Sequence, residues 1–149
     1  MERESMNLQI ANQKEIKGQW VICEMEDGPQ ITKVEKAVNN NVHNKMALWG
    51  FWQSEGSIKG EWGFNHIDQC RLATLEEIDM ESWREVFRRK GRVPGKFITG
   101  DWVTDDVNAL TVLYQDDDIV TVGVVNSTKT YQVAAEDLEP LFFKEDMAG

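Results

Sequence analysis

The sequence repeats one short phrase 82 positions apart, reading Gly-Gln-Trp-Val at residues 18–21 and Gly-Asp-Trp-Val at residues 100–103. Each copy is followed by short β-rich runs that turn residues interrupt. Each stretch then closes on a similar phrase, at residues 68–73 in the first and at residues 136–141 in the second. A fixed internal repeat constrains architecture before any local pattern does, so we expect two related β units.

The segment between the two units has the pattern of a helix. Thr74 followed by Glu77 is a capping-box signature, in which each side chain pairs with the backbone amide of the other residue. Acidic residues crowd the first turns and basic residues the last, as the helix dipole favours. The expected organisation is an N-terminal arm (1–17), a first unit (18–74), a linker helix and loop (75–98) and a second unit (99–149).

The second unit opens on GDWV at residues 100–103 and closes on TYQVAAEDLEPL at residues 130–141. These phrases resemble the opening and the ending of SH3-like barrels in their Tudor-like and KOW-like forms, where a strand passes through a short helical turn into the last strand. The resemblance covers Gly100–Phe143 well and Gly18–Ala73 less well, because the first unit has a longer second loop. It implies a mainly β fold of two SH3-like five-stranded barrels connected by one α-helix.

The composition is that of a soluble globular protein, with 41% apolar and 28% charged residues. No stretch approaches the ~20 apolar residues that a membrane-spanning helix needs. The N-terminal residues alternate charge and polarity and lack the apolar stretch of a signal peptide. We therefore expect a cytoplasmic protein.

Acidic charge is concentrated in the second unit. Residues 99–149 hold eleven acidic and two basic residues, a net charge of −9 within a chain total of −10. Nucleic-acid backbones bind clustered Lys and Arg, so this half is expected to repel them. The predicted partner is a protein with a basic or neutral surface, and nucleic acid is the less favoured alternative.

Large rings crowd the first unit and mark its candidate binding residues. Strand alternation places Trp49 and Phe51 on one face and Leu48 and Trp52 on the other, so at least one Trp should lie on an outer surface. The predicted partner-binding rings are Trp49, Trp52 and Trp62. The alternative is that the helix or the second unit covers them. The Tudor-like resemblance implies instead a cage for a methylated side chain, formed by Trp20, Trp52 and Trp62 with Glu26 or Glu61.

Two charged clusters are further candidates. An acidic face would consist of Asp105, Asp106, Asp116, Asp117 and Asp118, and the alternative is that these are solvated turn residues. A basic cluster that could touch nucleic acid would consist of Arg88, Arg89, Lys90 and Arg92. Its alternative is to end the helix favourably and to pair with the acids of the second unit.

The sequence offers no motif for catalysis. It has no phosphate-binding glycine loop, no nucleophile-elbow Ser and no cluster with metal-ligand spacing, so we expect no catalytic residue, metal or cofactor. Cys23 and Cys70 each lie in an apolar run and are expected to be buried, reduced thiols. The predicted function is a non-enzymatic adaptor or inhibitor, of the kind that a phage or mobile element encodes. The alternatives are a nucleic-acid-associated module and an acidic mimic of nucleic acid.

Overall fold

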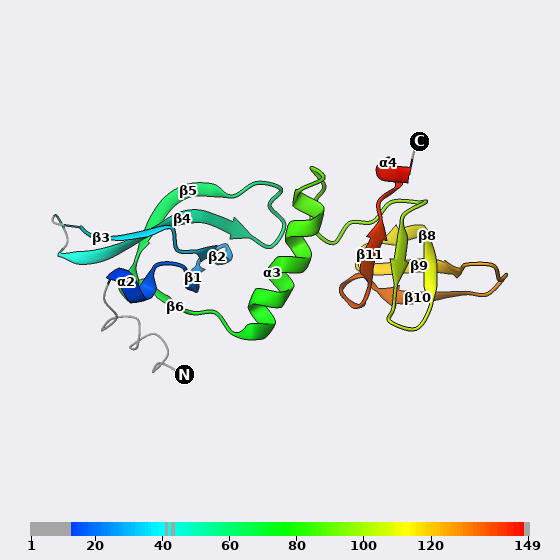
Figure 1. Cartoon of the computed structure of the whole chain (residues 1–149), viewed down its shortest axis with the longest axis horizontal. Coiled ribbons are helices and arrows are strands. Elements are labelled where there is room, and N and C mark those ends of the chain that lie inside the picture. The colour runs from blue at the N-terminus through cyan, green and yellow to red at the C-terminus, as the bar shows by residue number, and fades with distance from the viewer. Residues whose placement is uncertain (1–12, 41, 43, 148–149) are drawn as a thin grey trace. The chain divides into compact units, whose positions relative to one another are not determined.

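The structure, a computed structural model, describes residues 13–40, 42 and 44–147 (Figure 1). Most of the expected N-terminal arm, and His43, lie outside these residues. The chain divides into two compact units, which we call unit 1 (up to Arg84) and unit 2 (from Glu85). The boundary falls inside helix α3 (Leu75–Arg88), and each unit is described by itself.

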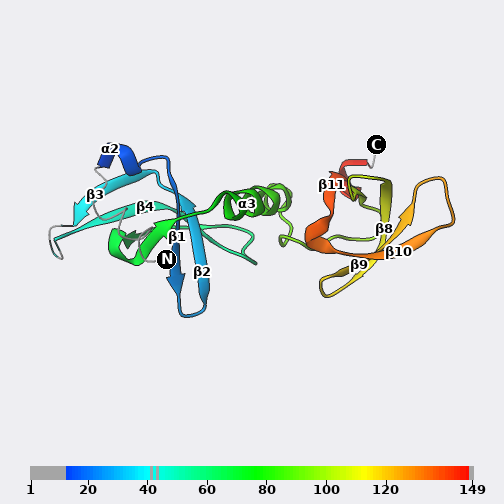
Figure 2. The same cartoon turned by 90° about the horizontal axis from the view of Figure 1, so that it is seen from below.

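Unit 1 is an antiparallel sheet of six strands that curls into a half-barrel (Figures 1 and 2). Its elements before α3 are α2 (Gln13–Ile16), β1 (Trp20–Met25), β2 (Gly28–Lys33), β3 (Lys36–Asn40), β4 (Lys45–Ser54), β5 (Glu61–His66), the 3-10 turn η1 (Ile67–Gln69) and β6 (Cys70–Leu72). The strand order is β3-β4-β2-β1-β6, and β5 pairs with the remaining edge of β4.

The curl of unit 1 comes from a change of partner along β4. β5 pairs with one edge of β4, while β3 and then β2 share the other edge. Between β2 and β3 the chain bends, and there the Val34 amide donates to the Gln19 carbonyl (2.9 Å) and the Glu35 amide to the Trp49 carbonyl (2.8 Å). The sheet therefore encloses a core, whose buried members are Ile16, Val21, Cys23, Val34, Ala37, Leu48, Trp52, Ile67 and Cys70.

Unit 2 is an antiparallel sheet of five strands in the order β10-β9-β8-β7-β11. Its elements after α3 are β7 (Trp102–Thr104), β8 (Ala109–Asp116), β9 (Ile119–Val124), β10 (Thr130–Ala134), η2 (Ala135–Asp137), β11 (Glu139–Phe142) and α4 (Lys144–Met147). Its buried apolar residues include Phe87, Phe97, Val103, Leu110, Val112, Val120, Val122, Leu138 and Phe143.

The prediction of two five-stranded barrels is correct at the level of a mainly β chain with two antiparallel sheets and a helix between them. It is wrong in detail, because the first sheet has six strands and forms only a half-barrel, and the second is not barrel-like. The physical reason lies in strand pairing. β8 keeps β9 as its partner along nearly its whole length, so the sheet of unit 2 does not turn a corner as unit 1 does between β2 and β3.

The repeated phrase has the same backbone hydrogen bonds in both units, and we call this shared arrangement the repeat frame. Gly18 and Gly100 both have positive φ, and their amides donate to Val34 (2.8 Å) and Val112 (2.9 Å). Those two residues donate back to the second residue of each phrase, at 2.9 and 2.8 Å. In both units a 3-10 turn precedes a last strand that pairs with the first. The sequence repeat therefore corresponds to a structural repeat.

Helix α3 begins with the predicted capping box. The Glu77 amide donates to Thr74 Oγ1 (3.1 Å), and the Thr74 amide donates to Glu77 Oε1 (2.8 Å). Gly91 follows the helix with a φ of 71°, a left-handed conformation that suits glycine after a helix end. Across the part of the chain that the structure describes, no helix is long and apolar enough to cross a membrane.

Candidate aromatic binding surface

The outer side of β3, β4 and β5 carries a continuous set of rings, which we call the aromatic face. Strand register puts Trp49 opposite Phe64, Phe51 opposite Trp62 and Ala47 opposite His66. Because directly opposed residues of antiparallel strands share a side of the sheet, these side chains all lie on one side. The aromatic face consists of Trp49, Phe51, Trp62, Phe64 and His66.

The rings of the aromatic face contact one another and also meet solvent. Ring centroids are 4.9 Å apart for Trp49 and Phe64, 5.0 Å for Phe51 and Trp62, and 5.9 Å for Trp49 and Trp62. Phe51, Trp62 and Phe64 keep 51%, 48% and 42% of their surface exposed. Mutual packing holds the rings in place without burying them, so unit 1 presents an ordered apolar surface.

The charged groups bordering the aromatic face are mainly basic. Lys36 Nζ lies 5.4 Å from the centroid of the Trp49 ring, a cation–π distance. Lys45 pairs with Asp68 at 2.8 Å, and the Asn40 amide group lies 3.1 Å from His66 Nε2. None of the side chains that β3, β4 and β5 direct to this side is acidic. The face is therefore aromatic with a weakly positive border, although the whole chain carries −10.

Trp52, one of the three predicted partner-binding rings, lies on the opposite side of β4. It is only 5% exposed and belongs to the core, where its indole nitrogen donates to the Gly63 carbonyl at 3.1 Å. Trp49 and Trp62 lie on the aromatic face, as alternation along the strand predicts. The cage of Trp20, Trp52 and Trp62 is not formed as an exposed site, because Trp52 is enclosed by the half-barrel.

A groove of about 690 Å³ lies elsewhere in unit 1, between helix α3 and one side of β1, β2, β6 and the end of β4. This volume is within the range of ligand pockets. Its apolar lining consists of Ile22, Pro29, Ile31, Leu72 and Met80. The charged groups that line it include Arg71 and Glu77, which bind each other, and Glu55 and Glu76.

The Arg71–Glu77 pair joins β6 to the start of α3. The guanidinium donates to both carboxylate oxygens, at 2.9 and 2.8 Å, and each side chain is about 30% exposed. Arg71, together with the bond from the Thr74 amide, lowers the pKa of Glu77 to about 2. Glu77 is thus held as a carboxylate that both caps the helix and anchors it to the sheet.

The two cysteines, predicted to be buried thiols, are both free and 1% exposed. Strand register places Cys23 of β1 directly opposite Cys70 of β6. Burial raises the pKa of both thiols. Their spacing in the sequence gave no sign that they are neighbours across two strands.

The predicted acidic face is divided between two turns at opposite ends of β8. Asp105 is held within its turn, where its carboxylate accepts bonds from the amides of Val107 (3.0 Å) and Asn108 (2.8 Å) and from the Tyr131 hydroxyl (2.6 Å). These bonds, that from Tyr131 foremost, lower the pKa of Asp105, and the carboxylate raises the pKa of Tyr131. Asp105 therefore stabilises a turn.

The other predicted acids are exposed turn residues. Asp106 and Asp117 have positive φ, at 74° and 56°, and Asp117 lies at the two-residue turn between β8 and β9. At ~3.3 Å per residue, the eight residues of β8 separate the two turns by about 25 Å. The structure does not bring the five aspartates into one patch.

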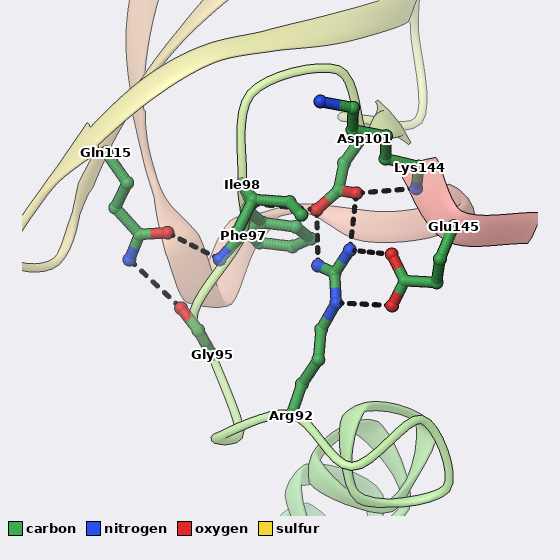
Figure 3. A network of polar contacts seen from close by, with 8 residues as sticks. All are labelled: Arg92, Gly95, Phe97, Ile98, Asp101, Gln115, Lys144 and Glu145. Atoms are coloured by element: carbon green, nitrogen blue, oxygen red, sulfur yellow. Dashed lines mark hydrogen bonds and ion pairs between the residues drawn. The ribbon is translucent and has the colours of Figure 1, made fainter. Parts of the chain in front are cut away.

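A buried network in unit 2 involves one of the predicted basic residues (Figure 3). The Arg92 guanidinium donates to both oxygens of Asp101, at 2.5 and 2.8 Å, and to Glu145. Asp101, 0% exposed, also accepts the backbone amides of Ile98 and Lys144, each at 2.9 Å. Arg92 lowers the pKa of Glu145. This network ties the loop after α3 and the start of α4 to the first strand of the sheet.

The four predicted nucleic-acid contacts do not form one exposed basic surface. Arg88 and Arg92 are largely buried, with side chains 3% and 10% exposed. Lys90 pairs with Asp146 at 3.0 Å, and Arg89 lies 3.8 Å from Glu85. Lys90 and Arg92 instead pair with acidic residues of the second unit, as the alternative interpretation predicted. These are Asp146 for Lys90, and Asp101 and Glu145 for Arg92.

Sequence reasoning missed Lys36 and His66 at the aromatic face and Asp101 in the Arg92 network. The register of β3 and β5 against β4 determines the first two, and no local pattern specifies it. The difference between Gln19 and Asp101 in the repeated phrase was the available signal for the third.

Comparisons with known proteins do not place the chain in a family. Neither the protein-family models, nor the curated proteins, nor the solved structures give a match. Within the described residues, no three His, Cys, Asp or Glu side chains gather as a metal site would require. The aromatic face is therefore assessed on its own chemistry.

Proposed function

We propose that this protein is a binding protein that presents the aromatic face of unit 1 to a protein partner. The observation that carries the proposal is the exposure of Phe51, Trp62 and Phe64, each above 40%, in one contiguous set of rings. Contiguous exposed apolar surface is uncommon on monomeric proteins and marks interaction sites. Trp is also enriched among the residues that dominate interface energies.

The rings do not contribute to the described core of unit 1, which supports a role outside folding. That core already contains Leu48 and Trp52 on the inner side of the same strand. Ordered, stacked rings lose little conformational entropy when a partner covers them, because they have few rotatable bonds and already contact one another. Such a surface suits a partner with apolar side chains at its centre.

We also propose that both units derive from one SH3-like ancestral unit. The common repeat frame, and a 3-10 turn before a last strand that pairs with the first, support this relation. An SH3-like origin would fit a binding role, although small β folds of one type host unrelated functions.

The test is partner capture with matched surface variants. Phe51→Ser with Trp62→Ser removes two exposed rings and leaves the core untouched. The control replaces Asp116, Asp117 and Asp118 with Ser and leaves the rings in place. We expect a partner that wild type and the control retain and the ring variant loses, confirmed with the purified partner by calorimetry. Equal binding by the ring variant would refute the proposal.

Single-stranded nucleic acid is a second candidate, favoured by the absence of acidic side chains on the aromatic face and by Lys36 beside Trp49. Bases stack on exposed rings with little sequence preference, and Lys neutralises phosphates. Fluorescence anisotropy with a labelled oligothymidine tests it. Binding that weakens as salt rises and that the ring variant loses would establish this candidate. No binding at low salt would eliminate it.

A further inference from the structure

The outer edge of β5 offers unpaired backbone groups. The Trp49 carbonyl accepts a bond from Glu35, so the odd-numbered residues of β4 direct their backbone groups toward β3. The even-numbered residues of β4 therefore form their backbone hydrogen bonds with β5. Their partners there are Gly63 and the other odd-numbered residues of β5. The amides and carbonyls of Trp62 and Phe64 therefore point away from β4. Among the described strands, β5 pairs with β4 alone, and Figure 1 shows it at the margin of unit 1.

This edge lacks the usual protection against strand pairing. Exposed edges are commonly shortened, bulged, or interrupted by Pro or Lys. At other sheet edges of this protein, β6 has three residues, β3 contains Lys36, and β11 contains Pro140 and a register shift, whereas β10 (Thr130–Ala134) lacks these features as well. β5 has six residues, Glu61–His66, without Pro, Lys or a register shift. β5 is the longer of the two unprotected edges, and it is the one that carries exposed rings.

Gly63, at the centre of β5, points to a close backbone neighbour. A Cβ atom built at this position would meet nothing within 4 Å, and Gly63 is not among the glycines with positive φ. Neither space nor backbone conformation within unit 1 therefore requires glycine there. Glycine inside a strand weakens it and often marks a place where another backbone approaches closely.

We propose that a second copy of this chain pairs with β5, antiparallel and about a two-fold axis at Gly63. In this register Trp62 lies opposite Phe64 of the second copy, and Phe64 lies opposite Trp62 of the second copy. These residues direct their amides and carbonyls outward, so each pair exchanges two hydrogen bonds and all four unpaired groups of each chain are satisfied. Glu61 comes opposite Asn65, a carboxylate beside an amide donor.

Strand register and charge both favour a second copy of this chain as the strand that pairs with the outer edge of β5. Pairing about Gly63 joins residues of equal parity, so the aromatic faces of the two chains continue on one side of the joined sheet. A shift by one residue would place rings against the inner side. Most of the net negative charge lies in residues 99–149, so β5 approaches β5 with little repulsion. Only the six residues of β5 in each chain would pair, so we expect a weak dimer that dissociates on dilution.

This dimer goes beyond the proposed function and does not depend on it. Edge pairing uses backbone groups and leaves the exposed ring surfaces available to a partner. The dimer can form without any partner being captured, and a partner can bind to a monomer. The dimer and the proposed binding function can therefore be refuted independently of each other.

Sedimentation velocity of the full chain over a concentration series tests the dimer. Phe64→Pro removes an outward amide that β4 does not use, and the control Phe64→Ala removes the same ring but keeps the amide. We expect the mass of wild type and Phe64→Ala to rise from 17.1 kDa toward twice that value, and Phe64→Pro to stay at 17.1 kDa. A monomeric wild type at the highest soluble concentration, or loss of the dimer in Phe64→Ala, would overturn the proposal.

A disulfide cross-link tests the register, and it remains informative if Phe64→Pro fails to fold. Directly opposed residues of a non-hydrogen-bonded pair have Cα atoms about 4.5 Å apart, which suits a disulfide. Gly63→Cys should therefore cross-link two chains under diamide. Asn65→Cys is the control, because its two copies would lie about 13 Å apart along the strands. Absence of the cross-link in Gly63→Cys, or an equal yield in Asn65→Cys, would refute the register.

Discussion

The two copies of the repeated phrase form the same backbone bonds but differ in what their second residue does. Gln19 of unit 1 is exposed, whereas Asp101 of unit 2 is 0% exposed and accepts bonds from Arg92 and two backbone amides. The backbone arrangement is the same in the two copies, while the side chain at the second position forms such contacts only in unit 2. The shared residues of the phrase thus identify the repeat frame, and the position at which the copies differ identifies a contact that is specific to unit 2.

The features that distinguish the two units from each other are of opposite kinds. Unit 1 carries an exposed aromatic face on β4 and β5, and unit 2 carries a buried ionic network that fixes its terminal segments. An exposed set of rings is suited to binding, and a buried network is suited to holding chain segments in place. This contrast is consistent with the proposal that unit 1 is the binding unit, while the network of unit 2 holds its own chain segments in place.

The largest expected effect on stability distinguishes the core of unit 1 from its aromatic face. Trp52→Ala should lower the free energy of unfolding of unit 1 by about 4 kcal/mol, because it empties a buried site. Trp62→Ala, on the exposed side of the neighbouring strand, should cost less than about 1 kcal/mol. Hydrogen exchange at the Val21 and Leu48 amides measures both. Similar losses would mean that the aromatic face is part of the core.

The second effect tests the difference between Asp101 and Gln19. Asp101→Ala should destabilise unit 2 by about 3 kcal/mol, the lower end for a broken buried ion pair, because Glu145 still pairs with Arg92. Gln19→Ala should change unit 1 by less than about 0.5 kcal/mol. Hydrogen exchange at Val103 and Leu110 reports unit 2. Equal losses of stability would mean that the side chain at the second position of the phrase has the same role in both units.

The third effect tests the frame itself at its two glycines. Both have positive φ, 86° at Gly18 and 101° at Gly100, so each Gly→Ala substitution should cost about 1 kcal/mol. Gly100→Ala should cost more, because its Cβ would lie 3.2 Å from the Lys144 side chain, whereas nothing lies within 4 Å of Gly18. Thermal unfolding of both variants measures the difference. A cost confined to one glycine would contradict a shared frame.

The sequence predicted those properties of the fold that depend on local pattern. The repeat, the capping box at Thr74, the buried cysteines and the opposite sides of Trp49 and Trp52 all follow from spacing along one segment. Closure of the sheets could not be predicted, because it depends on which strand β4 and β8 take as partners. The candidate site was incomplete for the same reason, since Phe64 and His66 join Trp49 only through the register of β5.

The smallest expected effect concerns the acid stability of unit 1. The pKa of Glu77 is lowered to about 2 by Arg71 and by the bond from Thr74, against about 4.3 in an unfolded chain. A lowered pKa in the fold means that Glu77 stabilises it fully above the unfolded value, and that this contribution is lost as pH falls toward 2. Since the side chain is about a third exposed, solvent screening reduces the contribution to about 1 kcal/mol.

Glu77→Gln should therefore flatten the decline in the stability of unit 1 between about pH 5 and pH 2, while lowering its stability at pH 7 by about 1 kcal/mol. Glu76→Gln is the matched control, one residue away in the same turn and exposed, and it should leave the profile unchanged. Hydrogen exchange of the β1 and β6 amides across this pH range measures both variants. Neither substitution removes a contact that the structure shows with unit 2, so the profile of unit 2 should be the same in both variants. If Glu77→Gln kept the wild-type slope, other carboxylates of unit 1 would have to carry its acid sensitivity.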